Sequence, residues 1–113
     1  MECTSAISGL QVSAVLDAQQ VLDGVLESGG SGEMVRDAEI YAAQSRLIRE
    51  EGIYTEPAGA AALAGLVKAQ QAGLIEPTSS VVCLVTGSGF KDRESIARML
   101  GATALPLIEA GDI

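Results

Sequence analysis

A hydroxyl residue, Thr86, ends the most apolar stretch of the chain and opens a loop of small residues. Residues 81–85 are all apolar, and Gly87-Ser88-Gly89 follows the threonine. A continuous apolar run that is bounded by turn residues is typical of a strand buried on both faces. Open α/β sheets bind ligands at such a Gly-rich turn between a strand and a helix. Thr86 is therefore the first candidate for a ligand contact.

A second group of small residues begins with the segment 55–57, Thr-Glu-Pro. It predicts a helix start, because proline is favoured at the first helical position. The helix is apolar nearly all round until Lys68, so we expect it to be the buried central helix. Gly59 and Gly65 each cost about 0.8–1 kcal/mol relative to alanine in a helix. We expect the close approach of another backbone or of a flat ligand to offset this cost.

The remaining elements follow from the spacing of apolar residues and from turn residues. The pattern predicts a helix that Asp17 caps and that stops at the Gly/Ser run 28–32. A strand at 33–36 and a helix that Asp37 caps and Gly52 ends come next. A helix at 93–100 and a strand or extended tail at 104–108 complete the pattern. The Gly/Ser run is either a flexible linker or an ordinary connection. This order of elements predicts an α/β fold, with a small parallel three-layer-type sheet flanked by helices.

Composition excludes several classes of protein. The net charge of −8, with only seven basic residues, argues against nucleic acid as a partner. No apolar run approaches the roughly 20 residues that span a membrane, and the N-terminus has no secretion signal, so we expect a cytoplasmic protein. Without histidine, and with Cys3 and Cys83 far apart, a zinc site is not expected. Cys83 is interpreted as a small buried hydrophobe.

Two motifs, in this order, resemble the C-terminal part of threonine synthase and its relatives. They are Glu51-Gly52-Ile53-Tyr54-Thr55-Glu56-Pro57-Ala58-Gly59-Ala60-Ala61 and Thr86-Gly87-Ser88-Gly89-Phe90-Lys91-Asp92. Those relatives are pyridoxal-phosphate enzymes of the tryptophan-synthase-β type, which include threonine dehydratase. Residues 27–36 are also similar to this family, so the similarity covers about residues 7–100. The resemblance implies that residues 1–113 form a single partial domain, a piece of the large domain of a fold type II enzyme.

The resemblance implies that Thr86 faces the pyridine nitrogen of pyridoxal 5'-phosphate. A hydroxyl donates a hydrogen bond to a neutral ring nitrogen but cannot hold a pyridinium as a carboxylate does. The ring is then a moderate electron sink, which suits elimination and replacement at the β or γ carbon. The alternative for Thr86 is purely structural, a strand-end hydroxyl that binds the backbone of the following loop.

Five further residues of the two motifs are candidates for cofactor binding. Gly87 and Gly89 either bring the backbone near the ring or simply make a tight turn. Glu56 either faces the site or is a carboxylate favoured at a helix start. Ala58 and Gly59 would form the floor of the pocket, where nothing larger fits.

Lys91 lies in a string that imitates the segment of the Schiff-base lysine in this family. That segment is near the N-terminus of those enzymes, whereas Lys91 follows the late apolar run, so we interpret it as a solvated residue at a helix start. The family's catalytic lysine, its asparagine beside the cofactor's 3-hydroxyl and its Gly-rich phosphate cup belong to regions upstream of the match. The isolated chain is therefore expected to bind the cofactor weakly and to be inactive.

Three functional hypotheses remain open. The chain is the C-terminal portion of a threonine-synthase-like lyase, with a possible N-terminal complementing half as its partner. Alternatively, it is a free-standing interaction module derived from that fold. A third hypothesis is a regulatory domain that binds an anion at the loop 87–91. A mean hydropathy of +0.32 and the open edges of a small sheet predict a homo-oligomer under either of the first two.

Overall fold

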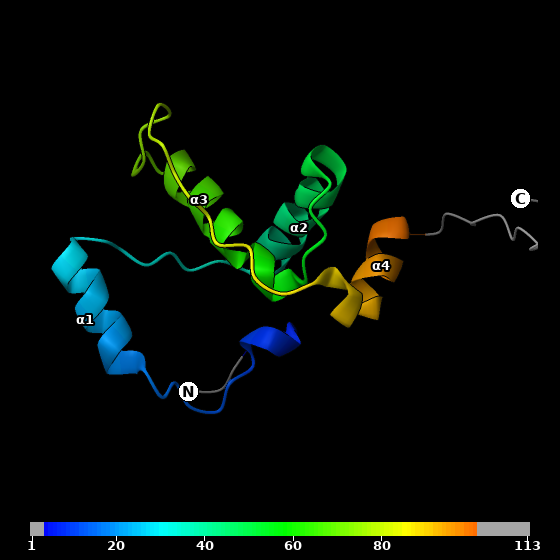
Figure 1. The fold of residues 1–113 in the computed structure, drawn as a ribbon, viewed down its shortest axis with the longest axis horizontal. Helices are drawn as coiled ribbons and strands as arrows, with labels where there is room; N and C mark the ends of the chain where they lie inside the picture. Colours follow the sequence, from blue (N-terminus) through cyan, green and yellow to red (C-terminus); the bar gives the residue numbers. More distant parts are fainter. Residues whose placement is uncertain (1–3, 102–113) are drawn as a thin grey trace, which may run out of the picture.

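The computed structural model describes residues 4–101, which form helices joined by extended segments. The α-helices are α1 (Ala18–Ser28), α2 (Asp37–Glu51), α3 (Ala61–Gln71) and α4 (Arg93–Leu100), and the 3₁₀ turns are η1 (Ser8–Leu10), η2 (Pro57–Ala60) and η3 (Gly89–Lys91). Figure 1 shows α2 and α3 meeting at one end, with α4 beside them and α1 set apart. The strand or tail predicted at 104–108 lies outside the described residues.

Glycines end the first two helices where the sequence predicts. Gly29 after α1 and Gly52 after α2 have φ of +65° and +69°, the left-handed conformation that closes a helix C-terminus. The predicted helix at 93–100 is confirmed as α4, and Gly101 follows it with a φ of +58°. These boundaries depend on local backbone preference, which explains why the sequence alone predicts them.

The helix starts differ from the predictions. Asp17 precedes α1, but its side chain makes no capping hydrogen bond. Asp37 is the first residue of α2 and does not cap it. Its carboxylate accepts hydrogen bonds from the hydroxyl of Ser5 and the backbone N–H of Ala6, both at 2.7 Å, and so anchors the N-terminal segment to α2.

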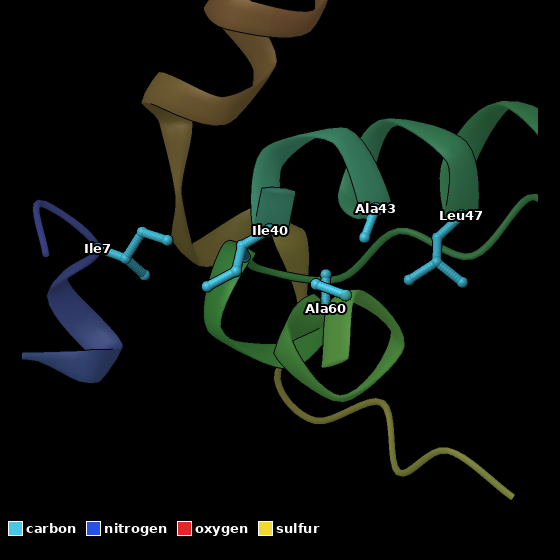
Figure 2. Packing of buried hydrophobic residues seen from close by; sticks show 6 residues of the cluster. Ile7, Ile40, Ala43, Leu47 and Ala60 are labelled. Atoms are coloured by element: carbon cyan, nitrogen blue, oxygen red, sulfur yellow. The ribbon is translucent and has the colours of Figure 1, made fainter. Parts of the chain in front are cut away.

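A small aliphatic core joins η1, α2, η2 and α3. Its buried members are Ile7, Ile40, Ala43, Leu47, Ala60 and Ala64, most of which are shown in Figure 2. Ile40 and Ala60 are almost completely buried, at 1% and 0% exposure. Because half of these side chains are alanines, α2 and η2 approach closely and the core is thin.

The predicted α/β class, with its small parallel sheet, is wrong for this structure. Residues 4–101 contain no strand, and the segments at 33–36 and 80–86 are extended but unpaired. A strand needs a neighbour to satisfy its backbone N–H and C=O groups, and the two extended segments do not provide this for each other. The apolar pattern therefore identified an extended segment correctly, whereas the sheet requires strands that these residues do not supply.

The expectation that the alanine-rich helix is central and buried is also wrong. The helix α3 begins only at Ala61, after η2, and within it Ala64 and Ala69 are the buried residues. Residues 81–84 run along α3 and border a cavity of about 450 Å³ with it (Figure 1). In the described part of the chain no sheet covers the other sides of α3, and its remaining apolar side chains are partly exposed.

The arrangement as a whole is open. The radius of gyration is 17.3 Å, whereas a compact domain of this length has about 13 Å. Many large apolar side chains are exposed, including Leu16, Leu26 and Val82 at 90%, 69% and 89%. Exposed apolar surface on this scale is uncommon in monomeric proteins.

Two smaller expectations concern location and the cysteines. No helix within residues 4–101 is long and apolar enough to cross a membrane. The cytoplasmic location stays a prediction. Cys83 is a free thiol that is only half-buried, against the expectation of full burial, because one side of its extended segment is uncovered. Cys3 lies outside the described residues.

Candidate functional site

The two sequence motifs meet at Thr55, whose side chain is 1% exposed. Its hydroxyl oxygen lies 2.7 Å from the carbonyl oxygen of Thr86 and 3.0 Å from that of Gly87. Close by, the N–H of Gly89 donates to the carbonyl of Tyr54 at 3.2 Å. Segments about thirty residues apart in the sequence are thus held side by side, and most of the predicted site residues come together.

Gly59 lies at the closest contact between the two motifs. A Cβ at this position would lie 2.9 Å from the carbonyl carbon of Thr86, and still closer to its oxygen and to the Thr55 hydroxyl. The predicted close approach of another backbone is therefore confirmed for Gly59. It is wrong for Gly65, where the nearest atom to such a Cβ would be 3.7 Å away, on Glu33, in ordinary contact.

The two glycines of the loop make room for side chains of the protein itself. Gly87 has a φ of +68°, and the Glu56 carboxylate fills the space beside it where a Cβ would stand. Gly89 is buried, and the Tyr54 ring packs directly against it. The tight-turn interpretation thus holds for Gly87, because an L side chain rarely adopts this conformation.

Thr86 lies at the surface of this assembly. Its backbone carbonyl is bound by Thr55, its side chain is exposed, and among residues 4–101 its hydroxyl makes no hydrogen bond. The purely structural alternative, a hydroxyl bound to the following loop, is not seen. An exposed hydroxyl on a fixed backbone is available to donate to a ligand.

Glu56 joins the loop to a neighbouring cavity. Its carboxylate accepts a hydrogen bond from the Lys91 ammonium at 3.1 Å, with side-chain exposures of 21% and 65% respectively. The pair borders a cavity of about 590 Å³ that is also lined by Ala58, Tyr41 and Arg98. Lys91 is exposed as predicted, but it lies in η3 and its pairing with Glu56 was not foreseen. An exposed pair of this kind contributes at most about 1 kcal/mol.

Ala58 forms part of the cavity wall and also contacts the N-terminal segment. A Cβ added to Gly9 would lie only 2.8 Å from the Cβ of Ala58, so these two backbones approach closely. A larger residue than alanine at position 58 would push η1 away from η2. The expectation that nothing larger fits at Ala58 and Gly59 agrees with these contacts.

Asp92 caps α4 through three hydrogen bonds. Its carboxylate accepts from the N–H groups of Glu94 and Ser95 at 3.1 and 3.2 Å, and from the Ser95 hydroxyl at 2.5 Å. The Ser95 hydroxyl is the main cause that holds the pKa of Asp92 below its ordinary value. This carboxylate occupies the Glu94 and Ser95 amides at the α4 N-terminus, so an anion has little to bind there. The third hypothesis, an anion at the loop 87–91, stays a prediction.

This cap predicts a specific response to acid. A lowered pKa means that Asp92 stabilises the fold fully above its ordinary pKa near 4 and that this stabilisation is lost as the pH falls through the lowered value. Replacement D92A should cost about 1 kcal/mol at neutral pH. D92N keeps the cap without a titrating group, so its helix content by circular dichroism should fall less than that of the parent between pH 4 and 2. Identical acid profiles for D92N and the parent would contradict the assignment.

Tyr54 carries a buried hydroxyl that has no hydrogen-bond partner among the described residues. Its ring packs edge-to-face on Phe90, with centroids 5.1 Å apart at 88°, and it borders an apolar cavity of about 540 Å³ next to α4. Y54F should therefore leave the free energy of unfolding unchanged or raise it by up to about 1 kcal/mol, because an unsatisfied polar group is removed. A clear loss of stability in urea unfolding would show that the hydroxyl has a partner after all.

Sequence reasoning missed the residues that hold this site together. Tyr54 and Thr55 lie inside the first motif, but no local pattern distinguishes a buried hydroxyl that binds a distant backbone from an exposed one. Gln44, which binds the Thr55 carbonyl at 2.8 Å, gave no signal except that it lies on the inner face of a predicted helix.

Comparison with known proteins identifies the class. Residues 2–87 match the family of pyridoxal-phosphate dependent enzymes, and the chain belongs to this family. Threonine synthase of Methanocaldococcus jannaschii is 40% identical over 80% of this chain, and that of Methanosarcina acetivorans is 42% identical over 79%. Each match covers 22% of the relative. The chain thus spans about a fifth of the length of the curated relatives that it matches.

The residues present fit one end of pyridoxal phosphate. The Thr86 hydroxyl is exposed and makes no hydrogen bond within residues 4–101, so it is a suitable donor for a ring nitrogen. The chain's lysines, Lys68 and Lys91, are both engaged, with the carbonyl of Met34 and with the Glu56 carboxylate. The described residues thus provide a hydroxyl of the type that a ring nitrogen accepts from, while both lysines are hydrogen-bonded to other groups of the protein.

Proposed function

We propose that this chain supplies the wall of a threonine-synthase-like lyase site that contacts the pyridine ring of the cofactor. Family membership and about 40% identity to threonine synthases support this assignment. Because the chain spans about a fifth of those relatives, we propose that it is inactive alone. The catalytic lysine and the phosphate loop would come from an upstream portion, in the same polypeptide or in a partner.

The observation that carries the proposal is the contact between the two motifs. The Thr55 hydroxyl and the space at Gly59 bring the Thr86 backbone against η2, while the Thr86 side chain remains exposed. When bound, pyridoxal phosphate supplies an electron sink. The role of Thr86 is to orient the ring with one neutral hydrogen bond, which favours elimination or replacement at the β or γ carbon.

The extended segment 81–85 supports the need for an upstream portion. Exposure alternates along it, with Val82 and Leu84 at 89% and 77%, and Val81 and Val85 at 46% and 37%. Side chains of a strand alternate between two faces, so one face lies toward α3 and the other is uncovered. Thr86 continues the uncovered face by the same alternation. Helices of the upstream portion would cover this face, and its strands would pair with the backbone of residues 81–85, which together would complete the site around Thr86.

Complementation tests the proposal. The chain is mixed with the M. jannaschii threonine synthase shortened to remove the segment that matches this chain. We expect the absorbance of bound pyridoxal phosphate and threonine formation in the mixture, and neither with this chain alone. L84D on the uncovered face should abolish complementation, whereas Q70D, the same charge at an exposed position of α3, should not. A mixture that neither binds the cofactor nor turns over contradicts the proposal.

A second candidate function is a free-standing interaction module that assembles with copies of itself. The uncovered face at 82–84 also favours it, because exposed apolar patches are typical of protein–protein interfaces. Sedimentation of the chain should then show a dimer or higher oligomer, and a clean monomer would contradict it. The mass of the native gene product separates the two candidates, since a much longer product favours the lyase.

A further inference from the structure

A chain of buried polar contacts connects the core to the exposed threonine. In α2, Gln44 is 2% exposed, and its side-chain amide donates to the carbonyl oxygen of Thr55 at 2.8 Å. The Thr55 hydroxyl, itself buried, lies 2.7 Å from the carbonyl oxygen of Thr86. The best-packed helix of the core is thus connected, through two side chains, to the backbone of the proposed cofactor contact.

The Thr55 hydroxyl lies within reach of two successive carbonyl oxygens of the loop, and the Glu56 carbonyl oxygen is farther away, at 3.3 Å. The hydroxyl has one proton, and we assign its hydrogen bond to the Thr86 carbonyl oxygen because that oxygen is the nearer one. The Gly87 carbonyl oxygen lies 3.0 Å away. Successive carbonyls of an extended chain point in opposite directions. Here they converge because Gly87 has a φ of +68°. The hydroxyl therefore stabilises a particular turn, and that turn leaves the Thr86 side chain on the exposed side.

Few hydrogen bonds hold the segment 80–87 in place. Within residues 80–87, the hydrogen bonds to the rest of the described chain are those of the Thr55 hydroxyl. The next contact is the N–H of Gly89 with Tyr54. An unpaired extended segment has many accessible conformations, so its end needs a specific anchor.

We infer that Thr55 is the positioning residue for Thr86, and that Gln44 orients Thr55 for this task. The inference deepens the proposed function, on which it rests for the identity of the ligand that Thr86 meets. Thr55 touches no ligand in this scheme. It sets the place and direction of a hydroxyl that does.

The first test needs no cofactor and uses the full chain labelled with ¹³C and ¹⁵N. In T55V, the carbonyl carbon resonances of Thr86 and Gly87 should shift and the Gly87 couplings should lose their left-handed signature. T55S, which keeps the hydroxyl, should restore both. The matched control is T78V, at an exposed threonine, which should leave these resonances in place. Unchanged Thr86 and Gly87 resonances in T55V overturn the inference.

A direct measurement covers the case in which T55V does not fold. In the parent chain, the Thr55 hydroxyl proton should exchange slowly with solvent and show a through-hydrogen-bond correlation to the Thr86 carbonyl carbon. A rapidly exchanging proton without that correlation overturns the inference.

The second test uses the complemented assembly with pyridoxal phosphate. T55V should lower kcat about 10- to 100-fold with little change in KM, because a misplacement of about 1 Å can cost this much. It should also shift the absorbance of the bound cofactor, and T55S should recover both. If the parent assembly binds no cofactor, the proposed function fails and the first test alone decides the role of Thr55. If the parent binds and T55V behaves identically, the inference fails and the proposed function stands.

Discussion

Replacing Gly59 by alanine should lower the free energy of unfolding by about 3 kcal/mol. The added Cβ would overlap the Thr86 carbonyl and the Thr55 hydroxyl. The Thr86 carbonyl is a backbone group and cannot rotate away as the end of a flexible side chain does, so the two motifs must separate. Urea unfolding followed by circular dichroism measures the loss, and faster amide exchange at Gly89 would locate it.

The matched control for this experiment is G65A in α3. Nothing lies closer than 3.7 Å to a Cβ at Gly65, so alanine should stabilise the helix by about 0.5–1 kcal/mol. Opposite signs for the two substitutions would show that the cost at Gly59 comes from the contact and not from the glycine itself. A G59A chain as stable as its parent would mean that the Thr86 loop moves away freely, which would remove the basis of the site.

The isolated chain should form no specific imine with pyridoxal phosphate and should show no lyase turnover. Imine formation needs a free amine at the carbonyl of the cofactor. A specific imine also needs the phosphate loop, which we propose lies in the upstream portion, while here Lys91 is paired with Glu56 and Lys68 binds the Met34 carbonyl. At equimolar cofactor, the absorbance band of an imine should be absent, and borohydride treatment should leave the mass of the chain unchanged. K91M should give the same spectrum as the parent.

A stable, stoichiometric adduct on either lysine would refute this expectation. Mapping the adduct by peptide mass would then show which lysine acts, and loss of the adduct in K91M would assign it to the lysine that lies beside Glu56. That result would mean that this chain carries its own Schiff-base lysine and does not require one from the upstream portion.

Helix ends and the family were readable from the amino-acid order. Gly29 and Gly52 close their helices because glycine adopts the left-handed conformation at little cost, a preference that operates within a few residues. The two motifs around Glu56 and Thr86 are likewise local strings, and the family comparison agrees with them. The cost of a glycine near a helix start also predicted the close contact at Gly59.

Strand pairing and side-chain burial could not be predicted from the sequence in this way. The apolar run 81–85 has the composition of a strand, but a sheet exists only where a second backbone lies alongside, and residues 4–101 provide none. For the same reason the alanine-rich helix lacks the cover that its composition requires. The apolar pattern identifies side chains that are stable only when they are covered. Which segment covers them depends on residues that are distant in the sequence.

The candidate site shows the same difference between what the sequence predicts and what only the packed structure shows. Thr86, its glycines and the Glu56 motif stand out by residue type and order, because turn and helix-start chemistry is local. That Thr55 is buried, binds the Thr86 backbone and is itself oriented by Gln44 emerges only once α2, η2 and the loop are packed together. A buried hydrogen bond depends on geometry between remote segments, and a single sequence carries no record of that geometry.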